Sequence, residues 1–195
     1  MEMIDAQSLE DQARPSLANL CRIFLDTAMA LEDVANAGYV HADMKPNNIL
    51  FTDDGRTRII DFGQAVKRGT VKPRMSGTPG YVAPEQPRCE AITDRTDVFN
   101  LGATMYRLLT SQFAPQTVHS NYPAAYANPG AMGTATGSRT LVSASREPIP
   151  PALSLLVFQC LELAPSARPP MARVAEQLRA IQLPAVYRAP ASSLP

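Results

Sequence analysis

The residues best suited to chemistry lie in one short stretch, HADMKPNNIL, at positions 41–50. Asp43 is followed by Lys45 two residues later and by Asn48 three residues after that, and Asp61 comes thirteen positions further on, in Asp-Phe-Gly. Carboxylate and amide oxygens are ligands that Mg²⁺ accepts, a carboxylate can act as a general base, and an ammonium group can pair with phosphate. This set of residue types is typical of phosphoryl transfer.

The segment between Asn48 and Asp61 predicts how these residues meet. The apolar runs ILFT and TRII flank the sequence DDGR, a pattern typical of a tight β-hairpin. If Thr52 pairs with Thr57, antiparallel pairing sets Asn48 opposite Asp61 at the open end of the hairpin. The acid and the cation of the preceding loop would then lie beside them.

Four segments show the apolar patterns of helices. Pro15–Asn36 has a single apolar face, its opening proline suits a first turn, and Gly38 can adopt the left-handed conformation after its end. Thr96–Thr110 is apolar nearly all round, which predicts a buried helix. Two more helices are predicted at Pro151–Leu163 and Met171–Ile181. We therefore expect an α+β fold, mainly α-helical, with a small β-hairpin at the active cleft.

Length and composition narrow the class of protein. A chain of 195 residues is one domain by length and can bury a sizeable core. The net charge is zero without a run of Lys or Arg, which argues against nucleic acid or an anionic membrane as partner. The longest apolar stretch, 152–158, is too short to span a bilayer. Three widely spaced cysteines and the lack of a secretory leader predict free thiols and a cytoplasmic location.

The stretch 41–50 resembles the catalytic loop of the protein kinase family, which usually reads H-R-D-L-K-P-x-N and is followed by D-F-G. The resemblance implies that Asp43 accepts the proton of the substrate hydroxyl and that Lys45 steadies the transferred phosphate. It implies ATP and Mg²⁺ as cofactors, with Asn48 and Asp61 as metal ligands and Leu50 on the floor of the adenine pocket. Proteins would be the substrates.

A second motif, SGTPGYVAPE at 76–85, resembles the family's substrate-docking segment. Thr78 matches the Thr that hydrogen-bonds to the catalytic Asp and Lys, and with Lys45 it favours Ser or Thr over Tyr as the acceptor. The resemblance also implies a buried ion pair between Glu85 and Arg168, which lies in the late motif PSARP.

Further expectations concern the support of the catalytic loop. By the same resemblance, His41 packs beneath Phe62, and Asp97 holds the backbone of the loop from below. The simpler reading of Asp97 is an acid that stabilises a helix N-terminus, and both can hold together.

Ala42 stands where most kinases carry an Arg that pairs with a phosphate on the activation loop. This difference argues against switching by phosphorylation of that loop. Residues 64–79 are basic and polar and predict a mobile loop, on which Thr70 and Ser76 are expected to be exposed.

The resemblance covers nearly the whole chain but only the large lobe of a kinase. We expect residues 1–182 to form this lobe, residues 112–148 to include a long variable loop, and residues 183–195 to be a disordered tail. The glycine-rich small lobe is absent and would be supplied upstream or in trans. The predicted function is transfer of the ATP γ-phosphoryl group to Ser or Thr of proteins, by a partial catalytic domain.

Three alternatives stay open. The chain could be a non-catalytic, pseudokinase-like module that docks partners through its substrate-facing surface. It could be a small-molecule phosphotransferase, although the segment at 76–85 argues against this. The reading frame could also be incomplete and start at an internal Met.

Overall fold

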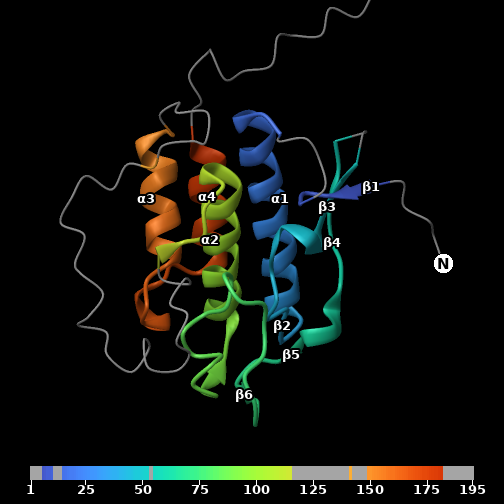
Figure 1. The fold of residues 1–195 in the computed structure, drawn as a ribbon, viewed down its shortest axis with the longest axis vertical. Helices are drawn as coiled ribbons and strands as arrows, with labels where there is room; N and C mark the ends of the chain where they lie inside the picture. The colour runs from blue at the N-terminus through green and yellow to red at the C-terminus, as the bar shows by residue number, and fades with distance from the viewer. Residues whose placement is uncertain (1–5, 11–14, 53–54, 116–140, 142–148, 182–195) are drawn as a thin grey trace, which may run out of the picture.

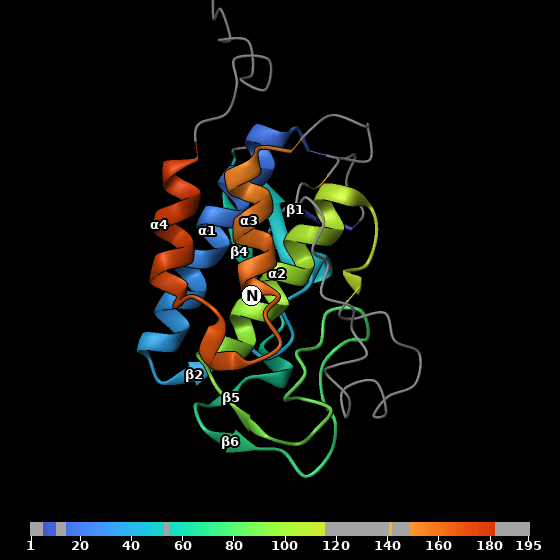
Figure 2. The same cartoon turned by 90° about the vertical axis from the view of Figure 1, so that its left-hand side faces the viewer.

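A computed structural model describes residues 6–10, 15–52, 55–115, 141 and 149–181. In this part of the chain, α-helices lie side by side, with short antiparallel strands along one side and one end (Figures 1 and 2). This arrangement agrees with the expected α+β, mainly helical class. The helices are α1 (Leu17–Asn36), α2 (Asp94–Thr110), α3 (Pro151–Cys160) and α4 (Met171–Ala180). The strands are β1 (Ala6–Ser8), β2 (Tyr39–Val40), β3 (Ile49–Thr52), β4 (Thr57–Ile59), β5 (Val66–Lys67), β6 (Thr70–Val71) and β7 (Ala91–Ile92).

Helix α1 begins later than its apolar pattern predicted. Ser16 is the N-cap, and its side chain accepts a hydrogen bond from the N–H of Asn19 (3.2 Å), so Pro15 lies outside the helix. Gly38 has a φ of 85° just past the end, as expected. The predicted apolar face is buried at its centre, and it also includes two residues that the pattern missed, Ile23 and Thr27.

Helix α2 lies at the centre of the helical layer and is buried along most of its length. It begins at Asp94, two residues before the predicted start, because Thr93 and Thr96 form a reciprocal capping box. A Cβ on Gly102 would lie 2.7 Å from the Cβ of Cys160 in α3. Glycine at this position therefore allows the two helices to approach closely.

Helices α3 and α4 end at Cys160 and Ala180, shortly before the ends that their apolar patterns predicted. Helix α4 packs along α1, and α3 packs along α2. None of the helices in the described ranges is both long and apolar enough to cross a membrane.

The hairpin of β3 and β4 is present, but the predicted register was wrong by one residue. Thr57 lies opposite Phe51 and not opposite Thr52. The N–H of Thr52 instead donates to the carbonyl of Arg56 (3.0 Å), and Gly55 has a φ of 77°. A three-residue connection whose third residue is a left-handed glycine is a common hairpin geometry, and it shortens the turn by one residue.

The shift changes what faces Asn48. The N–H of Ile60 donates to the carbonyl of Asn48 (3.0 Å), so these two residues are opposite each other and Asp61 lies one residue beyond the pair. Strand pairing therefore does not set Asn48 directly opposite Asp61.

Three strand pairings were not predicted from the sequence. Strand β1 adds to the hairpin through β3, and Leu9 just after it is buried in the core. Residues 64–79 are not a plain loop, because they contain β5 and β6, which pair with β2 and β7. This segment is tied to the rest of the fold at two places.

Arg168 is the largest fully buried side chain among the described residues. Its guanidinium donates twice to Glu85, from Nη1 to Oε1 (2.7 Å) and from Nη2 to Oε2 (2.8 Å). The remaining N–H groups donate to the carbonyls of Glu162, Arg95 and Leu163, at 2.7, 2.8 and 3.0 Å. All five donors of the guanidinium thus have an acceptor. The expected pair of Glu85 and Arg168 is present.

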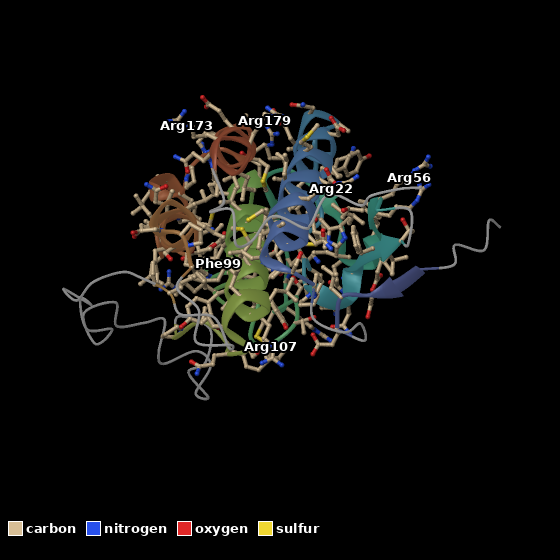
Figure 3. The ribbon with its side chains drawn as sticks, turned by 90° about the horizontal axis from the view of Figure 1, so that it is seen from above. Arg22, Arg56, Phe99, Arg107, Arg173 and Arg179 are labelled. Atoms are coloured by element: carbon tan, nitrogen blue, oxygen red, sulfur yellow. The ribbon has the colours of Figure 1, made fainter. Side chains whose placement is uncertain are left out.

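Each partner of this ion pair makes one further contact. Thr96 donates its hydroxyl to Oε1 of Glu85 (2.9 Å), and the guanidinium of Arg168 lies over the ring of Phe99, 4.9 Å from its centroid. Phe99 lies in the middle of the helical layer, whereas the arginines labelled in Figure 3 lie around its edge. The ion pair therefore joins the segment that contains Glu85 to the core.

Loss of one partner of this pair is expected to be costly. Arg168→Ala leaves the buried carboxylate of Glu85 without its cation, which costs about 3–5 kcal/mol. For a domain of this size the melting temperature is expected to fall by about 6–20 °C. Arg74→Ala, at an exposed position, is the control and is expected to change it little. Equal small shifts of the two variants in differential scanning calorimetry would contradict this role of the pair.

Candidate active site

Asp43, Lys45 and Thr78 form a closed triangle of hydrogen bonds. The hydroxyl of Thr78 donates to Oδ1 of Asp43 (2.7 Å), and Nζ of Lys45 donates to Oδ2 of Asp43 (3.1 Å) and to the hydroxyl of Thr78 (2.8 Å). Asp43 is buried, and the side chain of Lys45 is 19% exposed. Three residues that the sequence placed in two separate motifs therefore meet at the mouth of one site.

Asn48 supports the same loop from the other side. Its amide nitrogen donates to the backbone carbonyl of Asp43 (2.9 Å), and the residue is buried at the end of the 3₁₀ turn Pro46–Asn48. With the nitrogen used in this way, the amide oxygen is the atom that Asn48 can offer to a cation.

His41 contacts both the turn after β4 and the loop that contains Asp43. Its Nε2 is 3.1 Å from the carbonyl of Ile60, its ring meets that of Phe62 edge-on with centroids 4.8 Å apart, and its Nδ1 faces the N–H of Asp43 at 3.4 Å. The expected packing of His41 against Phe62 is confirmed. Burial lowers the pKa of His41, which favours the neutral ring with Nε2–H as donor and Nδ1 as acceptor.

Asp97 holds the backbone of the loop. Its Oδ2 and Oδ1 accept the N–H groups of His41 and Ala42, both at 2.8 Å, as the sequence predicted. Burial raises the pKa of Asp97 to about 7, while these two hydrogen bonds act in the opposite direction. Ala42 has a φ of 63°, a conformation that disfavours side chains with a Cβ. The two hydrogen bonds keep it there.

Asp61 also has a left-handed backbone, with a φ of 61°. Its Oδ1 accepts the N–H of Gly63 (3.2 Å), the local bond that lets Asp adopt this conformation. The side chain is exposed, and its charge acts on the pKa of His41 together with those of Asp43 and Lys45. Asp61 thus belongs to the same cluster of charges, brought there by the turn after β4.

The donor chemistry of Asn48 and Asp61 fits a hard cation. The described residues contain no group of three or more His, Cys, Asp or Glu side chains that could hold a metal ion. Mg²⁺ in phosphoryl-transfer sites commonly takes only one or two protein ligands and completes its shell with phosphates and water. One amide oxygen and one exposed carboxylate suit that kind of site.

Leu50 lies in the middle strand of its sheet, between Ser8 of β1 and Arg58 of β4. It is half-buried, so part of its side chain remains accessible. This position is compatible with an apolar contact to a ligand.

Two residues expected to be exposed on the basic segment are not. The hydroxyl of Thr70 donates to the carbonyl of Lys67 (2.7 Å), and the residue is half-buried. The hydroxyl oxygen of Ser76 is fully buried and has no hydrogen-bond partner among the described residues. Pairing of β6 with β7 and packing of the docking segment account for this burial, so neither hydroxyl is presented as a free phosphorylation site.

Gln86 supports the candidate site through its hydrogen bonds, and sequence reasoning missed it. Its Nε2 donates to the carbonyls of Ala42 (2.8 Å) and Ser76 (3.3 Å), and its Oε1 accepts the N–H of Ala83 (2.8 Å) and the amide of Asn100 (3.1 Å). It therefore ties the catalytic loop to the docking segment and to α2. The only signal in the sequence is a polar residue within an otherwise buried run.

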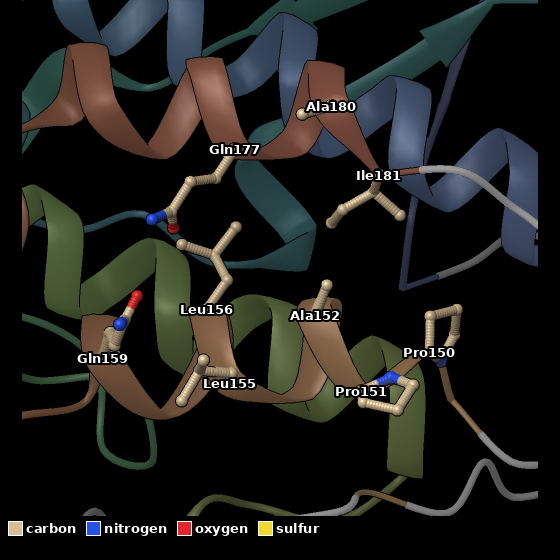
Figure 4. A pocket seen from close by; sticks show the side chains of 9 residues that line it. All are labelled: Pro150, Pro151, Ala152, Leu155, Leu156, Gln159, Gln177, Ala180 and Ile181. Carbon is tan, nitrogen blue, oxygen red and sulfur yellow. The ribbon is translucent and has the colours of Figure 1, made fainter.

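A groove of about 470 Å³ between α3 and α4 contains none of the predicted site residues (Figure 4). Its lining is mainly aliphatic, as at Leu156 and Ile181, with the amides of Gln159 and Gln177. It has no acid, base or cation in its lining, so it offers no groups for proton or phosphoryl transfer.

Comparisons with known proteins agree with this geometry. The family model described as the protein kinase domain matches residues 1–178. The leaf rust 10 disease-resistance locus receptor-like protein kinase-like 1.4 of Arabidopsis thaliana is 28% identical over 187 residues, which cover 88% of this chain and 28% of that protein.

Bacterial relatives match shorter parts. The serine/threonine-protein kinase AfsK of Streptomyces griseus is 42% identical over 83 residues, 40% of this chain and 10% of the relative. The DNA damage-responsive serine/threonine-protein kinase RqkA of Deinococcus radiodurans is 37% identical over 105 residues, 51% of this chain and 16% of the relative. The chain spans less than a third of the length of each of these three relatives.

The lowered pKa of His41 predicts a pH dependence of stability. Above its unfolded value of 6.5 the ring is neutral in both states, and the stabilisation is fully present. As the pH falls below 6.5, the unfolded chain binds a proton first, and this stabilisation is lost through the folded pKa. In His41→Gln the side chain cannot titrate.

The free energy of unfolding by urea, measured for both proteins from pH 5 to pH 8, checks this. The difference between wild type and His41→Gln is expected to be constant above about pH 7 and to move in favour of the variant at lower pH. Carboxylates common to both, including Asp97, largely cancel in the difference. A difference independent of pH would show that His41 titrates normally in the fold.

Proposed function

Because the chain belongs to the protein kinase family, we propose that it transfers the γ-phosphoryl group of ATP to Ser or Thr hydroxyls of protein substrates. The observation that carries this proposal is the triangle of Asp43, Lys45 and Thr78, which joins the catalytic loop to the docking segment. The relatives named as serine/threonine kinases support the choice of acceptor.

Asp43 is the proposed catalytic base. A carboxylate offers about four lone-pair positions, of which the hydrogen bonds from Thr78 and Lys45 use two. A substrate hydroxyl can therefore hydrogen-bond to a free position and give up its proton there. Thr78 and Lys45 fix the orientation of the carboxylate before the substrate arrives.

Lys45 has two proposed roles. Its ammonium neutralises Asp43 at 3.1 Å, and its third N–H is available to an oxygen of the transferred phosphate. Because the ammonium donates to Asp43 and can donate to a phosphate oxygen at the same time, it can hold the base and the phosphate in one geometry.

ATP and Mg²⁺, which the family generally uses, would supply the phosphoryl group and neutralise its charge when bound. The amide oxygen of Asn48 and the carboxylate of Asp61 are the proposed metal ligands, and Leu50 is the proposed contact to adenine. His41 and Phe62 keep the turn with Asp61 in place.

We further propose that residues 1–182 are a large lobe and that a small lobe, in the same polypeptide or in a partner chain, completes the nucleotide pocket. A cytoplasmic location is part of the proposal. It is supported by the three cysteines, all of which are free thiols.

Asp43→Asn is expected to lower turnover by a factor of about 10²–10⁴, because the amide cannot accept the proton of the substrate. ATP binding should persist, since Asp43 is not a proposed nucleotide ligand. Asp33→Asn, an exposed substitution on α1, is the matched control.

The measurement is transfer of radiolabelled phosphate from ATP to an acidic and a basic generic protein, in the assembly with a complete nucleotide pocket. Undiminished transfer by Asp43→Asn would refute the mechanism. No transfer by the wild-type assembly to either protein would favour a non-catalytic docking module.

Comparing Thr78→Val with Thr78→Ser tests how much the hydroxyl group of Thr78, as distinct from the volume of its side chain, contributes to turnover. Valine keeps the volume but removes the two hydrogen bonds that Thr78 makes in the triangle. Turnover is therefore expected to fall about tenfold or more, the effect of losing at least one hydrogen bond to a charged group. Serine keeps the hydroxyl and should retain most of the activity. The same transfer assay decides the outcome, and equal activity of the two variants would show that the triangle is dispensable.

A further inference from the structure

The segment that leads into the docking motif has an unusual charge, which continues through most of the motif. Residues 64–84 contain Lys67, Arg68, Lys72 and Arg74 but no Asp or Glu, in a chain with equal numbers of acidic and basic residues. An excess of one sign next to a site selects partners of the opposite sign.

Two of the four cations are used inside the fold. Nη2 of Arg68 donates to the carbonyl of Ala35 (2.7 Å), and its Nε lies 3.7 Å from Asp94. Nζ of Lys72 donates to the carbonyl and to the side-chain oxygen of Gln64, both at 3.0 Å.

The other two cations are available to a binding partner. Lys67 and Arg74 are exposed, and neither side chain makes a hydrogen bond or ion pair within the described residues. Arg74 precedes Thr78 by four residues, so their Cα atoms are at most about 14 Å apart. Thr78 contacts Asp43, and Arg74 therefore lies within reach of side chains that flank an acceptor hydroxyl.

Apolar side chains accompany these cations. Val71 is 59% exposed and Met75 is 48% exposed, so both present apolar surface to solvent. The exposed residues Lys67, Val71, Arg74 and Met75 of this segment, here called the basic docking surface, thus offer two cations and two apolar side chains.

We propose that the basic docking surface selects protein substrates in which Asp or Glu residues, together with an apolar residue, flank the Ser or Thr acceptor. This inference rests on the proposed function and names its substrate class. The neutral net charge of the chain argues against a nucleic acid as the partner.

Peptide binding tests the proposal without requiring catalysis. Three fluorescent peptides share one Ser acceptor and one apolar residue and differ only in flanking residues, which are Glu, Gln or Lys. Fluorescence anisotropy with the full chain at about 50 mM salt is expected to show the Glu peptide binding about tenfold more tightly than the Gln peptide, and the preference should shrink at higher salt.

Arg74→Glu and Lys67→Glu are each expected to lose about three- to fivefold in affinity for the Glu peptide and to gain affinity for the Lys peptide. Arg173→Glu, an exposed charge reversal on α4 (Figure 3), is the matched control and should leave the preference unchanged.

Equal affinity for the three peptides, no binding of the Glu peptide up to millimolar concentration, or an unchanged preference in Arg74→Glu would overturn the proposal. A result in favour of nucleic acid would also overturn it. In that case a short DNA duplex binds more tightly than any of the peptides, Arg74→Glu abolishes the DNA binding, and the three peptides bind equally. A preference for the Glu peptide without phosphate transfer in the complete assembly would uphold the surface and refute only the kinase mechanism.

Discussion

The buried ion pair between Arg168 and Glu85 is the constraint on which the rest of the structure depends. Burying two charges is expensive, and the expense is offset here because every donor of the guanidinium has an acceptor. Glu85 ends the docking segment and Thr78 lies near its start, hydrogen-bonded to Asp43. The docking segment is therefore held at one end by the core and at the other by the catalytic loop.

The sequence predicted which residues come together better than it predicted the geometry that brings them together. The resemblance of two motifs to those of the protein kinase family implied that Thr78 meets Asp43 and Lys45, and the structure brings the three together. The hairpin register was wrong because the turn was counted as four residues, although Gly at the third position favours a three-residue connection. That glycine was the available signal.

Long-range pairing explains what the sequence could not predict. Strand β1 and the pairs of β5 with β2 and of β6 with β7 are too short to show a period of two. The burial of Ser76 and the four bonds of Gln86 depend on segments far apart in the chain. Such contacts arise from the packed fold, and no local pattern encodes them.

The alanine at position 42 affects how the basic segment, residues 64–79, is ordered. Without a cation at that position, a phosphate on the segment has no partner there, so order must come from bonds within the chain. Backbone pairing through β5 and β6 supplies part of it, and Arg68 and Lys72 supply the rest through carbonyl and amide oxygens. Since these two cations order the segment themselves, Lys67 and Arg74 remain available to the solvent side. One stretch of sequence can in this way both shape its own backbone and present charge to a substrate.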